Sequence, residues 1–171
     1  MKVKLISGIL VEEGSFLGTQ FSGGFEINST QTMFAGIEIE EKLFSSIFIN
    51  GSFEYGVSKV NSKNSIINNF SDVKSSAFSV GLSDKNFFGG ILGFTYSEGL
   101  RINSGSVTLF NGISSGTFNI SPEGKERNME VSLGKTYKTS SLMLSLVHTE
   151  DLNNIKGEKQ NLVVLKALKK F

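Results

Sequence analysis

The chain has 171 residues, a length that suits one domain. It has 17 Lys and Arg against 16 Asp and Glu, and so balanced a charge produces no electrostatic field that would attract nucleic acid. It has no Cys and one His, which excludes disulfides, thiol chemistry and a clustered zinc site, and we expect no metal or cofactor. Its 19 Gly and single Pro disfavour a packed helical protein, because glycine costs about 1 kcal/mol per helical site.

Alternation of apolar and polar residues predicts strands along most of the chain. The first includes Val3, Leu5, Ile9 and Val11, where Glu12 and Glu13 interrupt the apolar run that a signal peptide would need. The next includes residues 37–40, and six more lie near 47–58, 78–83, 92–97, 129–134, 142–147 and 163–171. We expect about eight long strands and no helix, with segment 14–31 either an extra strand or a long connection.

The expected connections alternate in length along the chain. Segments 42–46, 84–88 and 139–141 are short, whereas 61–71, 110–128 and 153–160 are long and polar. Short turns at one end of a sheet and long loops at the other are typical of outer-membrane β-barrels. The strands are also long enough to cross a bilayer, which takes about 9–11 residues.

The two phases of the alternation differ in chemistry. Because Gly, Ser and Thr fill the polar phase, where a soluble strand would carry more Lys and Glu, we assign the apolar phase to lipid and the polar phase to a lumen. The lipid-facing prediction covers Val57, Phe78, Val80, Phe94, Val131 and Leu144, and the lumen-facing prediction covers Ser79, Gly81, Thr95, Ser132 and Gly134. Tyr55, Tyr96 and Tyr137 are expected to form an interface girdle, the alternative being core packing in a soluble sandwich.

Several segments resemble the barrel domain of subtilisin-like autotransporters. They are EEGSFLGTQFSGGFEI followed by MFAGIEIE, then FSDVKSSAFSVGLSDKNFFGG, LGFTYSEGLRINSGSVTLF and the closing VVLKALKKF. The resemblance runs from about Lys4 to Phe171 and is most specific over 70–109. Phe171 is similar to the aromatic last residue that serves such barrels as an assembly signal, while Lys169 departs from the apolar residue usual near that ending.

The resemblance implies the C-terminal part of a twelve-stranded antiparallel barrel in the outer membrane of a Gram-negative bacterium. Its function would be type V secretion, as a translocator and anchor for a passenger upstream in the same polypeptide. The implied partners are outer-membrane lipid, the barrel-assembly machinery and the passenger in cis. Residues 1–171 would form one barrel domain, truncated at its N-terminal side and without signal peptide or passenger, so no enzyme activity is expected in it.

Two alternatives stay open on the residues alone. One is a soluble or surface all-β binding module, in which long loops such as 110–128 supply the contacts. The other is a small outer-membrane barrel that closes on its own by pairing strand 3–11 with 161–171.

Two further patterns, a nucleophile-like motif and a set of glutamates, each have a functional interpretation and a simpler one. The run 112–116 matches the G-x-S-x-G nucleophile motif, but a polar loop follows it and His148 precedes Asp151, so we expect no catalysis there. Four glutamates fall in the lumenal phase and are interpreted as solvated wall charges, with pore tuning as the alternative: Glu38, Glu40, Glu54 and Glu130.

Overall fold

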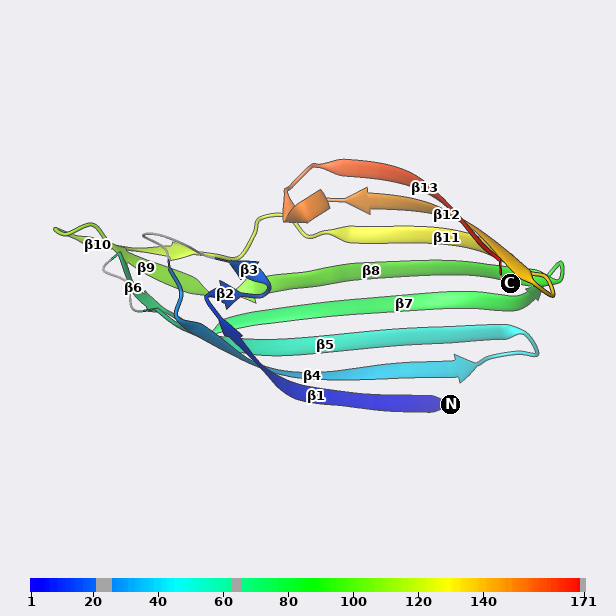
Figure 1. Cartoon of the computed structure of the whole chain (residues 1–171), viewed down its shortest axis with the longest axis horizontal. Helices are drawn as coiled ribbons and strands as arrows, with labels where there is room; N and C mark the ends of the chain where they lie inside the picture. The colour runs from blue at the N-terminus through cyan, green and yellow to red at the C-terminus, as the bar shows by residue number, and fades with distance from the viewer. Residues whose placement is uncertain (21–25, 63–65, 170–171) are drawn as a thin grey trace.

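The computed structural model describes residues 1–20, 26–62 and 66–169. Eight long strands form one antiparallel sheet in the order β1-β4-β5-β7-β8-β11-β12-β13, and Figure 1 shows them side by side. Their bounds are β1 Lys2–Glu13, β4 Ser29–Lys42, β5 Ile47–Asn61, β7 Val73–Phe87, β8 Gly90–Ser104, β11 Arg127–Thr136, β12 Ser140–Glu150 and β13 Lys159–Lys169. The all-β class, the antiparallel order and the eight strands are confirmed.

Each long strand pairs with the long strand that follows it in the chain, so every connection in this sheet is of the hairpin type. The β4–β5 pairing holds one register from Ser29 opposite Asn61 to Lys42 opposite Phe48. The β7–β8 pairing shifts register between Ser76 and Phe78, which is a β-bulge that bends and twists the sheet locally.

The connections sort by length as the sequence predicts. β4–β5, β7–β8 and β11–β12 are joined by short turns, and the other four connections are longer. Figure 1 shows the short turns at one end of the sheet, together with the N-terminus and the last described residues of β13, and the longer connections at the other end. We name these the short-turn end and the long-loop end.

Two segments expected as long connections, 61–71 and 110–128, contain further strands, and a third strand lies just before the second segment. β6 (Ile67–Phe70), β9 (Ser106–Phe110) and β10 (Ser115–Asn119) form a three-stranded sheet that extends beyond the long-loop end (Figure 1). The prediction that 110–128 is loop throughout is therefore wrong. A two-strand hairpin, β2 (Ser15–Phe16) with β3 (Thr19–Gln20), lies within 14–31, part of which is outside the described residues.

The buried apolar core is small and lies at the long-loop end. Phe16, Ile27 and Val73 pack together, with Val60 and Ile102 among the partly buried side chains around them. Phe16 comes from the β2–β3 hairpin and Ile27 from the segment before β4. This core accounts for few of the chain's apolar side chains, so most of them lie elsewhere.

β1 and β13 occupy opposite edges of the sheet. The pairing of 3–11 with 161–171, expected of a chain that closes on itself, is absent from the strand order of the described residues. The sheet is therefore open, and its placement in a larger barrel belongs to the proposals below.

Candidate membrane-facing surface

Strand pairing separates the side chains of the large sheet into two faces. Residues directly opposite each other in an antiparallel pair share a face, and neighbours along a strand alternate. One row that crosses all eight strands is polar throughout: Lys4, Glu38, Ser52, Ser79, Ser97, Asn128, Thr149 and Gln160. We name the face that carries this row the polar face.

The opposite side, which we name the apolar face, carries rows of large apolar side chains. One such row contains Ile49, Leu82, Phe94, Val131, Leu146 and Val163 from six neighbouring strands. Val80 on this face is 41% exposed and Leu5 is 78% exposed. Large apolar side chains of this face are therefore left uncovered by the rest of the described chain.

The polar face has the opposite pattern of burial. All six buried polar residues of the described chain lie on it: Thr30, Thr32, Ser58, Ser75, Ser145 and Thr149. Hydroxyl groups bond across neighbouring strands, with the Thr32 and Ser58 oxygens 2.8 Å apart and the Ser52 and Ser79 oxygens 2.8 Å apart. Glycines let side chains of this face approach closely. A Cβ added at Gly56 would lie 3.1 Å from the Ser75 Oγ, and one added at Gly81 would lie 2.5 Å from the Asn50 Oδ1.

A ladder of alternating charges bounds the apolar face at the long-loop end. Glu98, Arg127, Glu150 and Lys159 lie opposite one another on four successive strands. Glu150 lies 3.4 Å from the Lys159 ammonium and 3.9 Å from the Arg127 guanidinium, and Glu98 accepts a hydrogen bond from the Tyr96 hydroxyl at 3.1 Å. Local sequence patterns give no sign of this ladder, since each charge comes from a different strand and only the register brings the four charges together.

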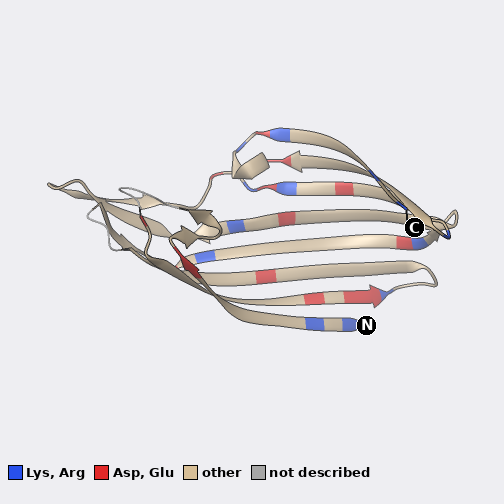
Figure 2. Ribbon diagram, viewed as in Figure 1, with Lys and Arg blue, Asp and Glu red and all other residues tan. Residues whose placement is uncertain are grey.

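The distance between charged positions sets the height of the apolar band. On β7 the apolar face carries Lys74 near one end and Asp84 near the other, and Figure 2 shows the strand between them free of charged residues. Ten residue steps at about 3.3 Å span roughly 33 Å along the strand. At a tilt of about 40° the band would be about 25 Å tall, which is the usual height in outer-membrane barrels.

The register of the strands determines on which face of the sheet each predicted site residue lies. The six predicted lipid-facing residues all lie on the apolar face, and the five predicted lumen-facing residues all lie on the polar face. Contact with lipid or with a lumen is a separate matter and stays a prediction. The four glutamates assigned to the lumenal phase also lie on the polar face, where Lys4 and Lys2 pair with Glu38 and Glu40 at 3.2 and 3.5 Å.

The three predicted girdle tyrosines occupy different levels of the sheet. Tyr55 lies opposite Ser76 and Tyr96 opposite Val80, both on the apolar face. Tyr137 lies beyond the end of β11, in the turn before β12. Phe171, the predicted assembly signal, is outside the described residues.

The G-x-S-x-G run lies in the hairpin between β9 and β10. The Ser114 backbone N–H donates to the Asn111 Oδ1 at 2.8 Å, and strand β10 begins at Ser115. The nucleophile motif needs a helix at that point. His148 lies on β12, where its Nδ1 is 2.7 Å from the Asn161 Oδ1.

Comparisons with protein-family models, with curated proteins and with solved structures return no match. The described residues include a short 3-10 helix, Leu152–Asn154, and no helix among them has the length and apolar character needed to cross a bilayer. Among the same residues, no group of three or more His, Asp or Glu side chains is placed to hold a metal ion.

Proposed function

We propose that the eight-stranded sheet is part of the wall of an outer-membrane β-barrel, with the apolar face against lipid and the polar face toward an aqueous lumen. One observation carries the proposal: rows of large, exposed apolar side chains cross one face of the sheet, whereas the buried polar side chains of the described chain all lie on the other face. A soluble sheet that presents one face to water has the reverse arrangement, because water favours the polar side chains.

The free energy of hydration supports the same orientation. Soluble monomers rarely expose a contiguous apolar patch larger than a few hundred Å², and here one face of all eight long strands is largely apolar. In hydrocarbon the same side chains need no cover. The Ser, Thr and Gly residues of the polar face would then border water and one another, as Thr32 and Ser58 do.

The charges on the polar face favour a wide lumen. In an eight-stranded barrel the side chains themselves fill the interior, and a charge there needs a partner. Glu54 and Glu130 have no ion-pair partner among the residues that the structure describes. A barrel with more strands, such as the twelve that the autotransporter resemblance implies, would keep these carboxylates hydrated.

On this basis the domain acts as a translocator and outer-membrane anchor for a passenger upstream in the same polypeptide, and it performs no catalysis itself. The barrel-assembly machinery would insert it and would recognise Phe171. The resemblance alone supplies these finer roles, so each rests on the placement of the sheet in the membrane.

Fractionation tests that placement. The chain, exported to the periplasm, should be recovered with outer membranes and should resist extraction at alkaline pH. Recovery in the soluble fraction without detergent would contradict the proposal and favour the soluble binding module. For translocation, a passenger fused upstream in the full-length polypeptide should become accessible to protease on intact cells, and retention in the periplasm of cells with a correctly inserted barrel would exclude the translocator role.

A further inference from the structure

We infer that the short-turn end docks on the headgroups of anionic phospholipid, an inference that rests on the proposed membrane placement and names the leaflet chemistry that this end contacts. The three short turns share a composition. Each places an exposed aromatic side chain beside one or two lysines: Phe44 with Lys42, Phe88 with Lys85, and Tyr137 with Lys135 and Lys138. We name these seven residues the basic-aromatic rim.

The aromatic side chains of the rim are unusual for turns in water. Phe44, Phe88 and Tyr137 are 69%, 87% and 55% exposed, at positions where turns normally favour Gly, Asn, Asp and Ser. Aromatic rings partition well into the headgroup region of a bilayer, where one edge meets hydrocarbon and the other meets water. Three separate turns with the same feature point to one surface in contact with the rim.

The backbone at Phe88 adds independent support. Phe88 and Gly89 form the two-residue turn between β7 and β8, and both have positive φ, at 47° and 71°. This turn geometry strongly prefers Asn or Asp before the glycine, and a bulky side chain in the left-handed region is strained. The Phe88 ring contacts the edge of the neighbouring Phe87 ring, with centroids 4.8 Å apart, and is otherwise largely exposed. Because most of the ring lies outside the fold, the aromatic side chain at this strained position points to a role in binding.

The lysines of the rim carry charge that the described chain does not neutralise. Lys42, Lys85, Lys135 and Lys138 take part in no salt bridge among the described residues. Lys42 and Lys85 lie on the polar face, where the Lys85 ammonium is 3.7 Å from the centre of the Phe48 ring. Lys135 lies on the apolar face and Lys138 in the turn, so these two lysines point toward lipid headgroups. Asp84, the nearest turn acid, already accepts a hydrogen bond from the Asn86 backbone N–H at 2.9 Å.

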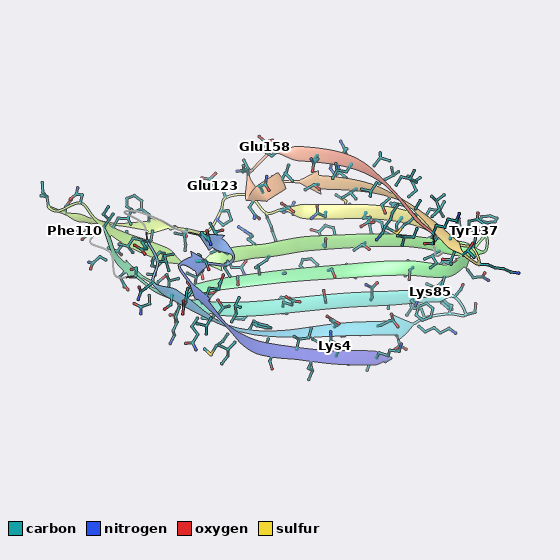
Figure 3. The ribbon with its side chains drawn as sticks, in the orientation of Figure 1. Lys4, Lys85, Phe110, Glu123, Tyr137 and Glu158 are labelled. Carbon is teal, nitrogen blue, oxygen red and sulfur yellow. The ribbon has the colours of Figure 1, made fainter. Side chains whose placement is uncertain are left out.

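The two ends of the sheet have opposite charge. Turn segments 42–46, 84–89 and 135–139 hold four lysines and one aspartate, a net charge of +3. Connections 14–28, 62–72, 105–126 and 151–158 hold six acidic and three basic residues, a net charge of −3. Figure 3 labels Lys85 and Tyr137 at the short-turn end and Glu123 and Glu158 toward the other. An anionic surface would therefore attract the short-turn end and repel the long-loop end.

The experiment refolds the full chain from urea in the presence of phosphatidylcholine vesicles with and without phosphatidylglycerol, and measures the bound fraction by co-sedimentation. The rim variant K135Q/K138Q is compared with K63Q/K156Q, which removes two lysines from the long-loop connections. Since one lysine near an anionic surface changes the partition constant about fivefold, the rim variant should lose at least about tenfold on anionic vesicles. The control variant should keep its affinity for anionic vesicles. Added salt should lower the affinity of the native chain toward that of the rim variant.

The substitution Phe88→Asn provides a second test, because its two expected effects have opposite directions and a purely structural role of Phe88 would not produce both. It should stabilise the turn against urea because asparagine suits the left-handed region, and yet lower the fraction bound to vesicles. Equal binding of native chain and rim variant to anionic vesicles would overturn the inference while leaving membrane placement intact. Absence of binding to either kind of vesicle, in a chain with full strand content, would overturn the membrane placement as well.

Discussion

Replacing Val80 with lysine tests which face of the sheet meets hydrocarbon. Val80 lies on the apolar face of β7, opposite Gly51 on one side and Tyr96 on the other, and its side chain is 41% exposed. Ser79, its neighbour in the chain, lies on the polar face with its hydroxyl 2.8 Å from that of Ser52. The two positions share a strand and a level and differ in the face they occupy.

The expected costs follow from the two environments. A lysine on the lipid face near the bilayer midplane costs about 2–4 kcal/mol. Ser79→Lys loses one hydroxyl hydrogen bond, about 0.5–1.5 kcal/mol, and its ammonium can reach water in the lumen. If the apolar face were in water instead, Val80→Lys would change stability by only about 0.5 kcal/mol, as other exposed surface substitutions do.

The assay is equilibrium unfolding by urea of the membrane-inserted protein, with the native chain and Val80→Ala as references. The free energy of unfolding should fall in the order native, Ser79→Lys, Val80→Lys. Equal losses in the two lysine variants, or a larger loss at Ser79, would refute the assignment of faces.

Three further predictions concern the long-loop end. Gly124→Ala should destabilise the contact between the β8–β11 and β12–β13 connections, because its Cβ would lie 2.5 Å from the Asn154 carbonyl oxygen and 2.7 Å from the Lys156 nitrogen; proteolysis within 151–158 should accelerate. The pKa of Asp151 is lowered because its carboxylate accepts backbone N–H bonds from Gly157 and Lys125. Its stabilising contribution is therefore complete above the ordinary carboxyl value of 3.8 and is lost as pH falls through the lowered value; Asp151→Asn should remove that part of the acid dependence of urea unfolding. Glu150→Gln should cost no more than about 1 kcal/mol, since its ion pairs with Arg127 and Lys159 are partly exposed, and a double-mutant cycle with Lys159→Gln measures that coupling.

The sequence predicts the strands of the large sheet because their chemistry alternates with period two. Leu142, Leu144 and Leu146 alternate with smaller or more polar neighbours. All three leucines lie on one face of β12, which pairs in register with β11 and β13. The short turns are also predictable from local sequence, because two alternating runs separated by only a few residues can be joined only by a hairpin turn. Placement of predicted residues on the two faces follows from the same alternation.

The elements that local sequence patterns do not predict depend on contacts between distant segments. Ser115–Asn119 does not alternate clearly, and it becomes a strand because β9 lies beside it, with the Thr108 and Thr117 hydroxyls 3.0 Å apart. The charge ladder from Glu98 to Lys159 likewise needs the register of four strands. Local patterns contain no information on such pairings, so only the structure reveals them.

The open edges of the sheet lead to the last prediction. An edge strand leaves backbone N–H and C=O groups of alternate residues unpaired, and each unpaired group costs several kcal/mol in hydrocarbon. β1 has 12 residues and β13 has 11, so two bare edges would cost tens of kcal/mol, more than the roughly 5–15 kcal/mol that stabilises a typical domain.

In a membrane both edges must therefore be paired, either with each other or with other strands. Leu5 and Leu165, on the apolar face of β1 and β13, are 78% and 67% exposed and distinguish these cases. In membranes of cells that make the protein, L5C and L165C should not cross-link within one chain if the barrel is wider than eight strands, because other strands then separate β1 from β13. As a control, L144C and L165C, directly opposite on β12 and β13, should cross-link. A disulfide within one chain of the L5C/L165C variant would refute the wider barrel and establish a small barrel that closes on itself, whose side-chain-filled interior could not pass a polypeptide.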